Sequence, residues 1–211
     1  AFLVSQMQHM RFSYTEANLL PENHEVNVEY NQFLEIFGEE GNLILLGIQD
    51  TTIFTPEKFN AWNKLAKSFD SVKEIDFTVS IADVKKLTAD RKNRKFVLEP
   101  LYKENPKTAE EVNSVKKQLF EKLPFYDNLL YNKETETIQT AIYIDKKIVN
   151  TKERKALVFD ILNPKITQFE QENNLNIRVS GMPYIRTLNS QNIVDEIQLF
   201  VLGALLITAL I

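Results

Sequence analysis

The chain has 211 residues, of which 44% are hydrophobic and 26% are charged, so it can bury the core of one large domain or two small ones. Its net charge of -4 argues against a nucleic-acid partner, because proteins that bind nucleic acid usually carry an excess of basic residues. It contains no cysteine, which excludes a disulfide framework and a cysteine metal site.

The first 38 residues are predicted to be a lead-in segment. Residues 1–10 lack the basic start and the long apolar core of a signal peptide, and they resemble the exit of an earlier membrane helix. Residues 25–37 carry apolar side chains at helical spacing, and Gly38 follows where a helix favours a left-handed residue. We therefore expect a helix over residues 25–37 that follows a membrane span.

Residues 39–189 are predicted to form the main domain. Residues 43–48 (LILLGI) are a near-continuous apolar run, which predicts a central strand buried on both faces. A helix should follow, because Thr55-Pro56 supplies a hydroxyl cap and a proline at the first helical position. Its apolar stripe extends to Phe69 and includes Trp62, which is expected in the core rather than on a ligand-stacking surface.

Alternating apolar residues predict the next strand over residues 72–81. Four of them are expected to face one way, namely Ile75, Phe77, Val79 and Ile81. Residues 84–136 then interrupt the pattern and are interpreted as an insertion. It contains a basic run between residues 85 and 95 and one helix, opened by the capping box of Thr108 and Glu111. The basic run is interpreted as a solvated face, and its alternative is contact with anionic lipid head groups.

The pattern of strand and helix resumes after the insertion. Residues 137–145 predict a strand, and residues 176–180 predict the last strand. Between them, Asn150 and Glu153 predict the capped start of a helix, which Pro164 should bend or break. Strand, helix, strand, insertion, strand, helix, strand is the order of a ferredoxin-like split βαβ domain. The predicted fold class is therefore α+β, with two helices covering one face of a four-stranded sheet.

The last 22 residues, 190–211, lose their charges along the chain. From Leu199 to Ile211 only Thr208 is polar, which is typical of contact with hydrocarbon. A membrane span needs about 20 apolar residues. We expect residues 190–211 to be an amphipathic helix that enters a transmembrane helix cut off by the end of the chain.

No residue is predicted to be catalytic, to bind a cofactor or to ligate a metal. The five glycines form no phosphate-binding pattern, and His9 and His24 have no partner at ligand spacing. Ser180-Gly181 lacks the preceding glycine of a nucleophile elbow, so a turn is the better interpretation. The chain is not expected to be an enzyme.

A set of segments spread over almost the whole chain is similar to one known family. These segments are Leu20-Pro21, Tyr30 to Gly38, Leu43 to Ile48, Thr55-Pro56-Glu57, Val79-Ser80, Val179 to Pro183 and Asn192 to Phe200. They resemble the first extracytoplasmic loop of a resistance-nodulation-division (RND) superfamily transporter, closest to the branch of mycobacterial-type lipid exporters (MMPL) and patched-like proteins. The residues assigned to the family motif, with a structural role, are Phe37, Gly38, Ser180, Gly181 and Pro183.

This resemblance implies a ferredoxin-like porter domain outside the cytoplasmic (inner) membrane, between the first two transmembrane helices of an exporter. The implied partners are the remainder of the transporter with a second porter domain, membrane lipid, and a lipid or other hydrophobic substrate. Export would use the proton gradient through acidic residues of central membrane helices, so no residue here is assigned to proton transfer. The alternative hypothesis is an extracytoplasmic sensor or interaction domain of a membrane receptor.

Overall fold

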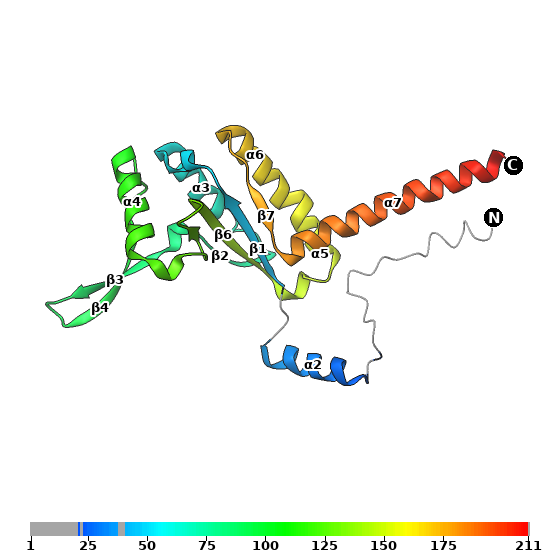
Figure 1. Cartoon of the computed structure of the whole chain (residues 1–211), viewed down its shortest axis with the longest axis horizontal. Coiled ribbons are helices and arrows are strands. Elements are labelled where there is room, and N and C mark those ends of the chain that lie inside the picture. Colours follow the sequence, from blue (N-terminus) through cyan, green and yellow to red (C-terminus); the bar gives the residue numbers. More distant parts are fainter. Residues whose placement is uncertain (1–20, 22, 38–40, 211) are drawn as a thin grey trace.

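The structure is a computed structural model that describes residues 21, 23–37 and 41–210. It has an α+β fold with antiparallel sheets and an apolar C-terminal helix, which confirms the predicted class (Figure 1). The helices and strands are α2 (Glu25–Phe37), β1 (Leu43–Ile48), α3 (Pro56–Lys67), β2 (Ile75–Val79), β3 (Lys85–Asp90), β4 (Lys95–Pro100), α4 (Ala109–Lys122), β5 (Tyr131–Asn132), β6 (Thr137–Ile144), α5 (Lys152–Ala156), α6 (Asn163–Asn173), β7 (Arg178–Ser180) and α7 (Met182–Leu210).

The main sheet has the strand order β2-β6-β1-β7, and the short β5 also pairs with β6. Every pair in it is antiparallel. Strand β1 is central. Its Leu45 lies opposite Ala141 of β6 on one side and opposite Ser180 of β7 on the other. Strands β3 and β4 form a separate two-stranded sheet.

Two helical connections link the strands of the main sheet. Helix α3 connects β1 to β2, and α5 with α6 connects β6 to β7, so each connection passes over one intervening strand. Helices α3 and α6 contact each other. The core forms between these helices and one face of the sheet, and its sheet side consists of Ile44, Leu46, Ile48, Ile138, Ile142 and Ile144.

Trp62 of α3 lies in this core. Its side chain is fully buried, and its ring meets Phe169 of α6 edge to face with a centroid distance of 5.8 Å. Such aromatic pairs contribute about 0.5–1.5 kcal/mol beyond the apolar area that they bury. Phe59 and Phe69 are also fully buried. The prediction that Trp62 belongs to the core is confirmed.

Strand β1 forms over the predicted residues, but the prediction that both of its faces are buried is wrong. Ile44 and Leu46 are fully buried under the helices, whereas Leu43 and Leu45 on the other face are half-buried. A continuous apolar run cannot show whether one or both faces of a strand are covered, because that depends on where the helices pack.

The predicted alternation over residues 72–81 is wrong as well. A bulge lies between Ile75 and Phe77 of β2. Ile75 is buried on the helix side, whereas Phe77 and Val79 lie opposite Tyr143 and Ala141 on the other face. A bulge adds one residue to a strand, so the side chains after it change face.

Pro164 interrupts its helix as predicted, and a π-helical segment precedes it. This segment, Leu157–Leu162, separates α5 from α6. Proline lacks an amide hydrogen and its ring collides with the preceding turn, which a wider turn accommodates. The predicted start of this helix is wrong by one residue, since Thr151 and not Asn150 occupies the N-cap position.

The predicted N-terminal cap forms in α4 but not in α3. The capping box of Thr108 and Glu111 opens α4, as predicted. Thr55 does occupy the N-cap position of α3, with Pro56 next to it, but its hydroxyl donates to the carbonyl of Thr52 instead of capping the helix.

The insertion, residues 84–136, takes part in the fold. Val112, Val115 and Leu119 of α4 are buried in the main core, and β5 extends the main sheet. The remaining part of the insertion, the β3-β4 hairpin, projects from the body at the end opposite to α7 (Figure 1). The sequence prediction missed this hairpin.

Candidate functional site

The face of the main sheet that the helices leave open is the first candidate site. Leu43 and Leu45 of β1 lie there beside Ala141 and Tyr143 of β6. Phe77 of β2 stacks on Tyr143 with ring centroids 4.4 Å apart and planes 21° apart. Phe77 is exposed. This face is therefore an apolar surface that the helices on the opposite face do not cover.

A groove of about 300 Å³ crosses this face, and we call it the sheet groove. Its floor is the sheet, and its wall is the loop over residues 125–130, which presents the exposed side chains of Phe125 and Leu129. The described residues that line it are Leu43, Leu45, Val79, Phe125, Tyr126, Asn128, Leu129, Leu130, Gln139, Ala141 and Tyr143, and none of them is charged. Such a surface suits an apolar ligand or the apolar side chains of a partner.

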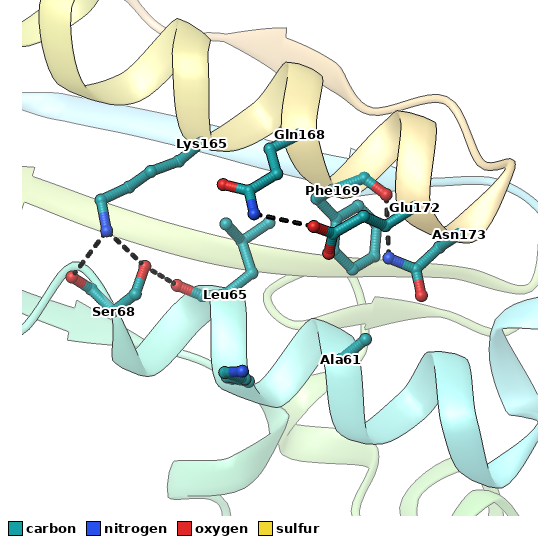
Figure 2. Close-up of a pocket in the computed structure, with 9 residues that line it drawn as sticks. Ala61, Leu65, Ser68, Lys165, Gln168, Phe169, Glu172 and Asn173 are labelled. Carbon is teal, nitrogen blue, oxygen red and sulfur yellow. Dashed lines mark hydrogen bonds between the residues drawn. The ribbon is translucent and has the colours of Figure 1, made fainter.

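A second hollow, of about 310 Å³, lies between α3 and α6 (Figure 2). Lys165 reaches across it from α6 and donates to the Ser68 hydroxyl at 3.1 Å. Gln168 donates to Glu172 at 2.7 Å within α6. The bond from Lys165 to Ser68 joins α6 to the end of α3, and we call this hollow, which polar and apolar side chains line together, the polar crease.

The junction between the sheet and α7 is the second candidate site. Gly181 alone separates β7 from α7, and its φ is +116°. A Cβ atom at this position would overlap the carbonyl oxygen of Leu43 and would come within 3.0 Å of Ile44 Cα. Only glycine fits a positive φ at such a close approach of two strands. The helix thus starts at Met182, earlier than the predicted residue 190.

A buried arginine fixes the first turns of α7 to the body. Arg154 of α5 and Thr187 of α7 are each 2% exposed. Arg154 Nε donates to Thr187 Oγ1 at 3.1 Å, and its Nη1 donates to the carbonyl of Val149. The Thr187 hydroxyl in turn donates to the carbonyl of Pro183 at 2.7 Å. Hydrogen bonds to a buried charged group are among the stronger ones in proteins. The bond between Arg154 and Thr187 therefore fixes the orientation of α7 relative to the body.

The outer part of α7 has an apolar surface in contact with nothing else in the described chain. Leu199, Phe200, Leu202 and Leu206 are all exposed. The span from Met182 to Thr208 is long and apolar enough to cross a membrane, by length and composition. Among the described residues it is the one helix with this property.

The structure brings three of the five family-motif residues together at the junction. Ser180 ends β7, Gly181 makes the turn, and Pro183 lies in the first turn of α7. Phe37 is the last residue of α2, and its side chain and Gly38 lie outside the described residues.

Sequence analysis missed Arg154 and Thr187. A signal for Arg154 is present, because it lies three and four residues before Leu157 and Val158 and so shares their buried helix face. No comparable signal marks Thr187.

The histidines and acidic residues form no candidate metal site in the part of the chain that the structure describes. His24 is exposed, and its Nδ1 accepts a hydrogen bond from the Val26 amide at the start of α2. His9 lies outside the described residues. The sheet groove therefore offers an apolar binding surface, and the junction offers a mechanical connection to α7. The described residues place no acid-base pair at either site.

Comparison with known proteins gives no family for this chain. No protein-family model matches it, and no curated protein matches it significantly.

Replacing Gly181 by alanine should lower the free energy of unfolding by more than about 2 kcal/mol, because a Cβ there meets the backbone of β1 at a positive φ. Gly203→Ala is the matched control: this glycine lies in α7 with no heavy atom within 4 Å of an added Cβ. It should be neutral or slightly stabilising. Denaturant unfolding followed by the fluorescence of Trp62, the one tryptophan, measures both changes. Equal stability of the two variants would contradict the tight junction.

Replacing Thr187 by valine should lower the free energy of unfolding by about 1–3 kcal/mol, because the buried Arg154 Nε loses this hydrogen-bond acceptor. Thr208→Val is the control, because Thr208 makes the same bond to a carbonyl four residues earlier but is exposed. It should change stability by less than about 0.5 kcal/mol. The same fluorescence assay compares them, and a loss of similar size in both would mean that the bond to Arg154 contributes nothing.

Proposed function

We propose that this chain contains the first extracytoplasmic porter domain of a proton-driven exporter of the RND superfamily, in its MMPL and patched-like branch. The strand order supports the ferredoxin-like part of this proposal. The units β1-α3-β2 and β6-α5-α6-β7 are each split by a strand of the other, as in ferredoxin-like domains. The domain belongs to a protein of the cell (inner) membrane and lies on its outer side.

The observation that carries the proposal is the continuous path from the sheet into an apolar helix. Strand β7 passes through Gly181 into α7, whose first turns are bonded to the body and whose outer part is apolar and exposed. A membrane helix connected in this way moves the whole domain when it moves, because no flexible linker lies between them.

The sheet groove provides the contact with a hydrophobic substrate. A lipid or another hydrophobic compound gains free energy by leaving water for a surface such as that of Leu45, Val79 and Tyr143, at about 25 cal/mol per Å² of apolar area. A second porter domain of the same transporter closes over this face and completes the substrate path.

The mechanism is conformational and involves no covalent step. Protonation of acidic residues in the membrane helices of the remaining transporter shifts those helices between two arrangements. Helix α7 transmits the shift, and the sheet groove opens alternately toward the membrane surface and toward the outside. No cofactor takes part.

A sensor domain is the second candidate, and the bonded junction also favours it. A ligand in the sheet groove would reposition α7 through the contact of Arg154 with Thr187. The two functions differ in what crosses the membrane, because a sensor passes a signal and an exporter moves a compound.

A charge in the sheet groove should stop export. Leu45→Lys places an ammonium group on the half-buried open face, where an apolar substrate would have to remove its water. Gln168→Lys adds the same charge to the polar crease between α3 and α6 and serves as the control. Flux of fluorescent lipid analogues, driven by a proton gradient in proteoliposomes that contain the whole protein, should fall at least about tenfold for Leu45→Lys and stay unchanged for Gln168→Lys.

Deletion of residues 41–180 provides the second arm of this test. Export should stop while the protein still inserts into the membrane. Export that persists after the deletion refutes the porter role, and unchanged flux with Leu45→Lys refutes the role of the sheet groove. A wild-type protein that shows no flux of any analogue, but changes conformation when one binds, identifies the sensor instead.

A further inference from the structure

In the described part of the chain, the β3-β4 hairpin projects from the body and lines neither the core nor the sheet groove. Within the described chain its strands pair only with each other, and the edge of β3 is contacted by one side chain, since the Tyr126 hydroxyl donates to the Lys85 carbonyl at 3.3 Å. It points away from the body at the end opposite to α7 (Figure 1). Free edges and exposed apolar side chains on a two-stranded sheet are typical of surfaces that bind another chain.

One face of the hairpin is apolar and open to solvent. Leu87 lies opposite Leu98, and Ala89 lies opposite Phe96, so these four side chains share a face. Leu87, Leu98 and Phe96 are 63%, 62% and 71% exposed. Three large apolar side chains that lie together on one exposed face form a patch, and such patches mark contact surfaces more often than single exposed apolar residues do.

The other face of the hairpin is polar except for Val97, and one of its side chains is bonded to α4. Thr88 donates across the strands to Glu99 at 3.2 Å, and Lys86 donates to Gln118 of α4 at 3.3 Å. A hairpin that only completed the fold would turn its apolar face to the core. Here the bond from Lys86 to α4 lies on the polar face, and the apolar face is turned outward.

The base of the hairpin is fixed in the core. Val84 and Leu101 flank it, are both buried, and are joined by a backbone hydrogen bond of 2.9 Å. Next to them, Asp83 forms an ion pair with Lys67 of α3 and accepts hydrogen bonds from Ser80. Burial raises the pKa of Asp83, but these hydrogen bonds outweigh burial and lower it below its ordinary value of 3.8. The ion pair therefore persists at neutral pH.

The tip of the hairpin is ordered and basic. Asp90 accepts hydrogen bonds from the amides of Lys92 and Asn93, both at 3.1 Å. Arg94 has a φ of +51°, which closes the turn. The exposed cations of the tip are Arg91, Lys92, Arg94 and Lys95, and none lies within 4.0 Å of a carboxylate in the described part of the chain.

The charge of the hairpin is opposite to that of the chain. Residues 85–100 contain six Lys or Arg and two Asp or Glu, whereas the chain as a whole has a net charge of -4. An apolar strip that ends in unpaired cations is complementary to a surface with an apolar strip flanked by carboxylates. Anionic lipid has a complementary charge as well, but α7 and the hairpin lie at opposite ends of the molecule (Figure 1).

We propose that the β3-β4 hairpin is a docking arm for an acidic protein partner, which adds its own apolar strip to the face of Leu87, Phe96 and Leu98 and pairs its carboxylates with the basic tip. The partner lies on the far side of the domain from the bilayer. This direction depends on the membrane placement of α7 proposed above, whereas the apolar face and the charge do not.

Peptide binding to the whole protein in detergent tests this proposal. The probe is a fluorescein-labelled soluble peptide in which Glu alternates with Val, with proline at both ends to prevent self-assembly, and the control peptide has Lys in place of Glu. Fluorescence anisotropy should show binding of the Glu peptide only, and the binding should weaken as NaCl is raised.

Two double variants should each weaken this binding at least about tenfold. Phe96→Ser with Leu98→Ser removes the apolar strip, and Arg91→Glu with Lys92→Glu reverses the tip. Because all four side chains are exposed, the fold should survive, which Trp62 fluorescence can verify. Lys73→Glu with Lys152→Glu is the control for exposed cations elsewhere and should bind as the unmodified protein does.

Three outcomes overturn the proposal. The first is equal binding of both peptides, or binding that the hairpin variants do not change. The second is binding of the hairpin to phosphatidylglycerol vesicles without binding to the Glu peptide, which identifies lipid. The third is self-association that the hairpin variants abolish, again without peptide binding, which identifies a second copy. Failure of the export proposal is separate, because Leu45→Lys should leave peptide binding unchanged.

Discussion

The close approach of Gly181 to the backbone of β1 is the constraint on which the arrangement of this protein depends. It lets the chain leave β7 and enter α7 with one residue between them. Thr187 is then placed beside the buried Arg154, and α7 departs from the body without a flexible linker. The domain and its apolar helix therefore act as one mechanical unit. The same connection would serve an exporter that rocks its outer domain with its membrane helices.

A second consequence follows from placing α3 and α6 on one side of the sheet. The helix side contains the fully buried isoleucines and Trp62, which stabilise the domain. The other side keeps its apolar side chains near water, and the loop over residues 125–130 shapes them into the sheet groove. One face of these strands thus stabilises the domain, and we propose that the opposite face of the same strands serves recognition. The hairpin, which we propose as a second contact surface, lies at the end of the domain opposite to the helix that we place in the bilayer (Figure 1).

Strong local patterns in the sequence made much of the fold predictable. Where the structure differs from the prediction, tertiary contacts are the cause. The stripe that contains Trp62 and the apolar run of β1 are visible in the sequence, and both form as predicted. The bulge before Phe77 was not visible, because it depends on how β2 pairs with β6. The open face of β1 and the bond from Arg154 to Thr187 were missed for the same reason. In the hairpin, the basic residues concealed the short alternation around Leu87 and Leu98.

The central claim is that the outer part of α7 lies in a bilayer while the body lies in water. The chain itself has no cysteine, so Leu202→Cys and Gln171→Cys each introduce a single labelling site into it. Both side chains are exposed in the structure, so only a bilayer should distinguish them. In lipid nanodiscs, a membrane-impermeant maleimide should label position 171 and leave position 202 unlabelled until detergent is added. Equal labelling of both positions in intact nanodiscs would contradict the account.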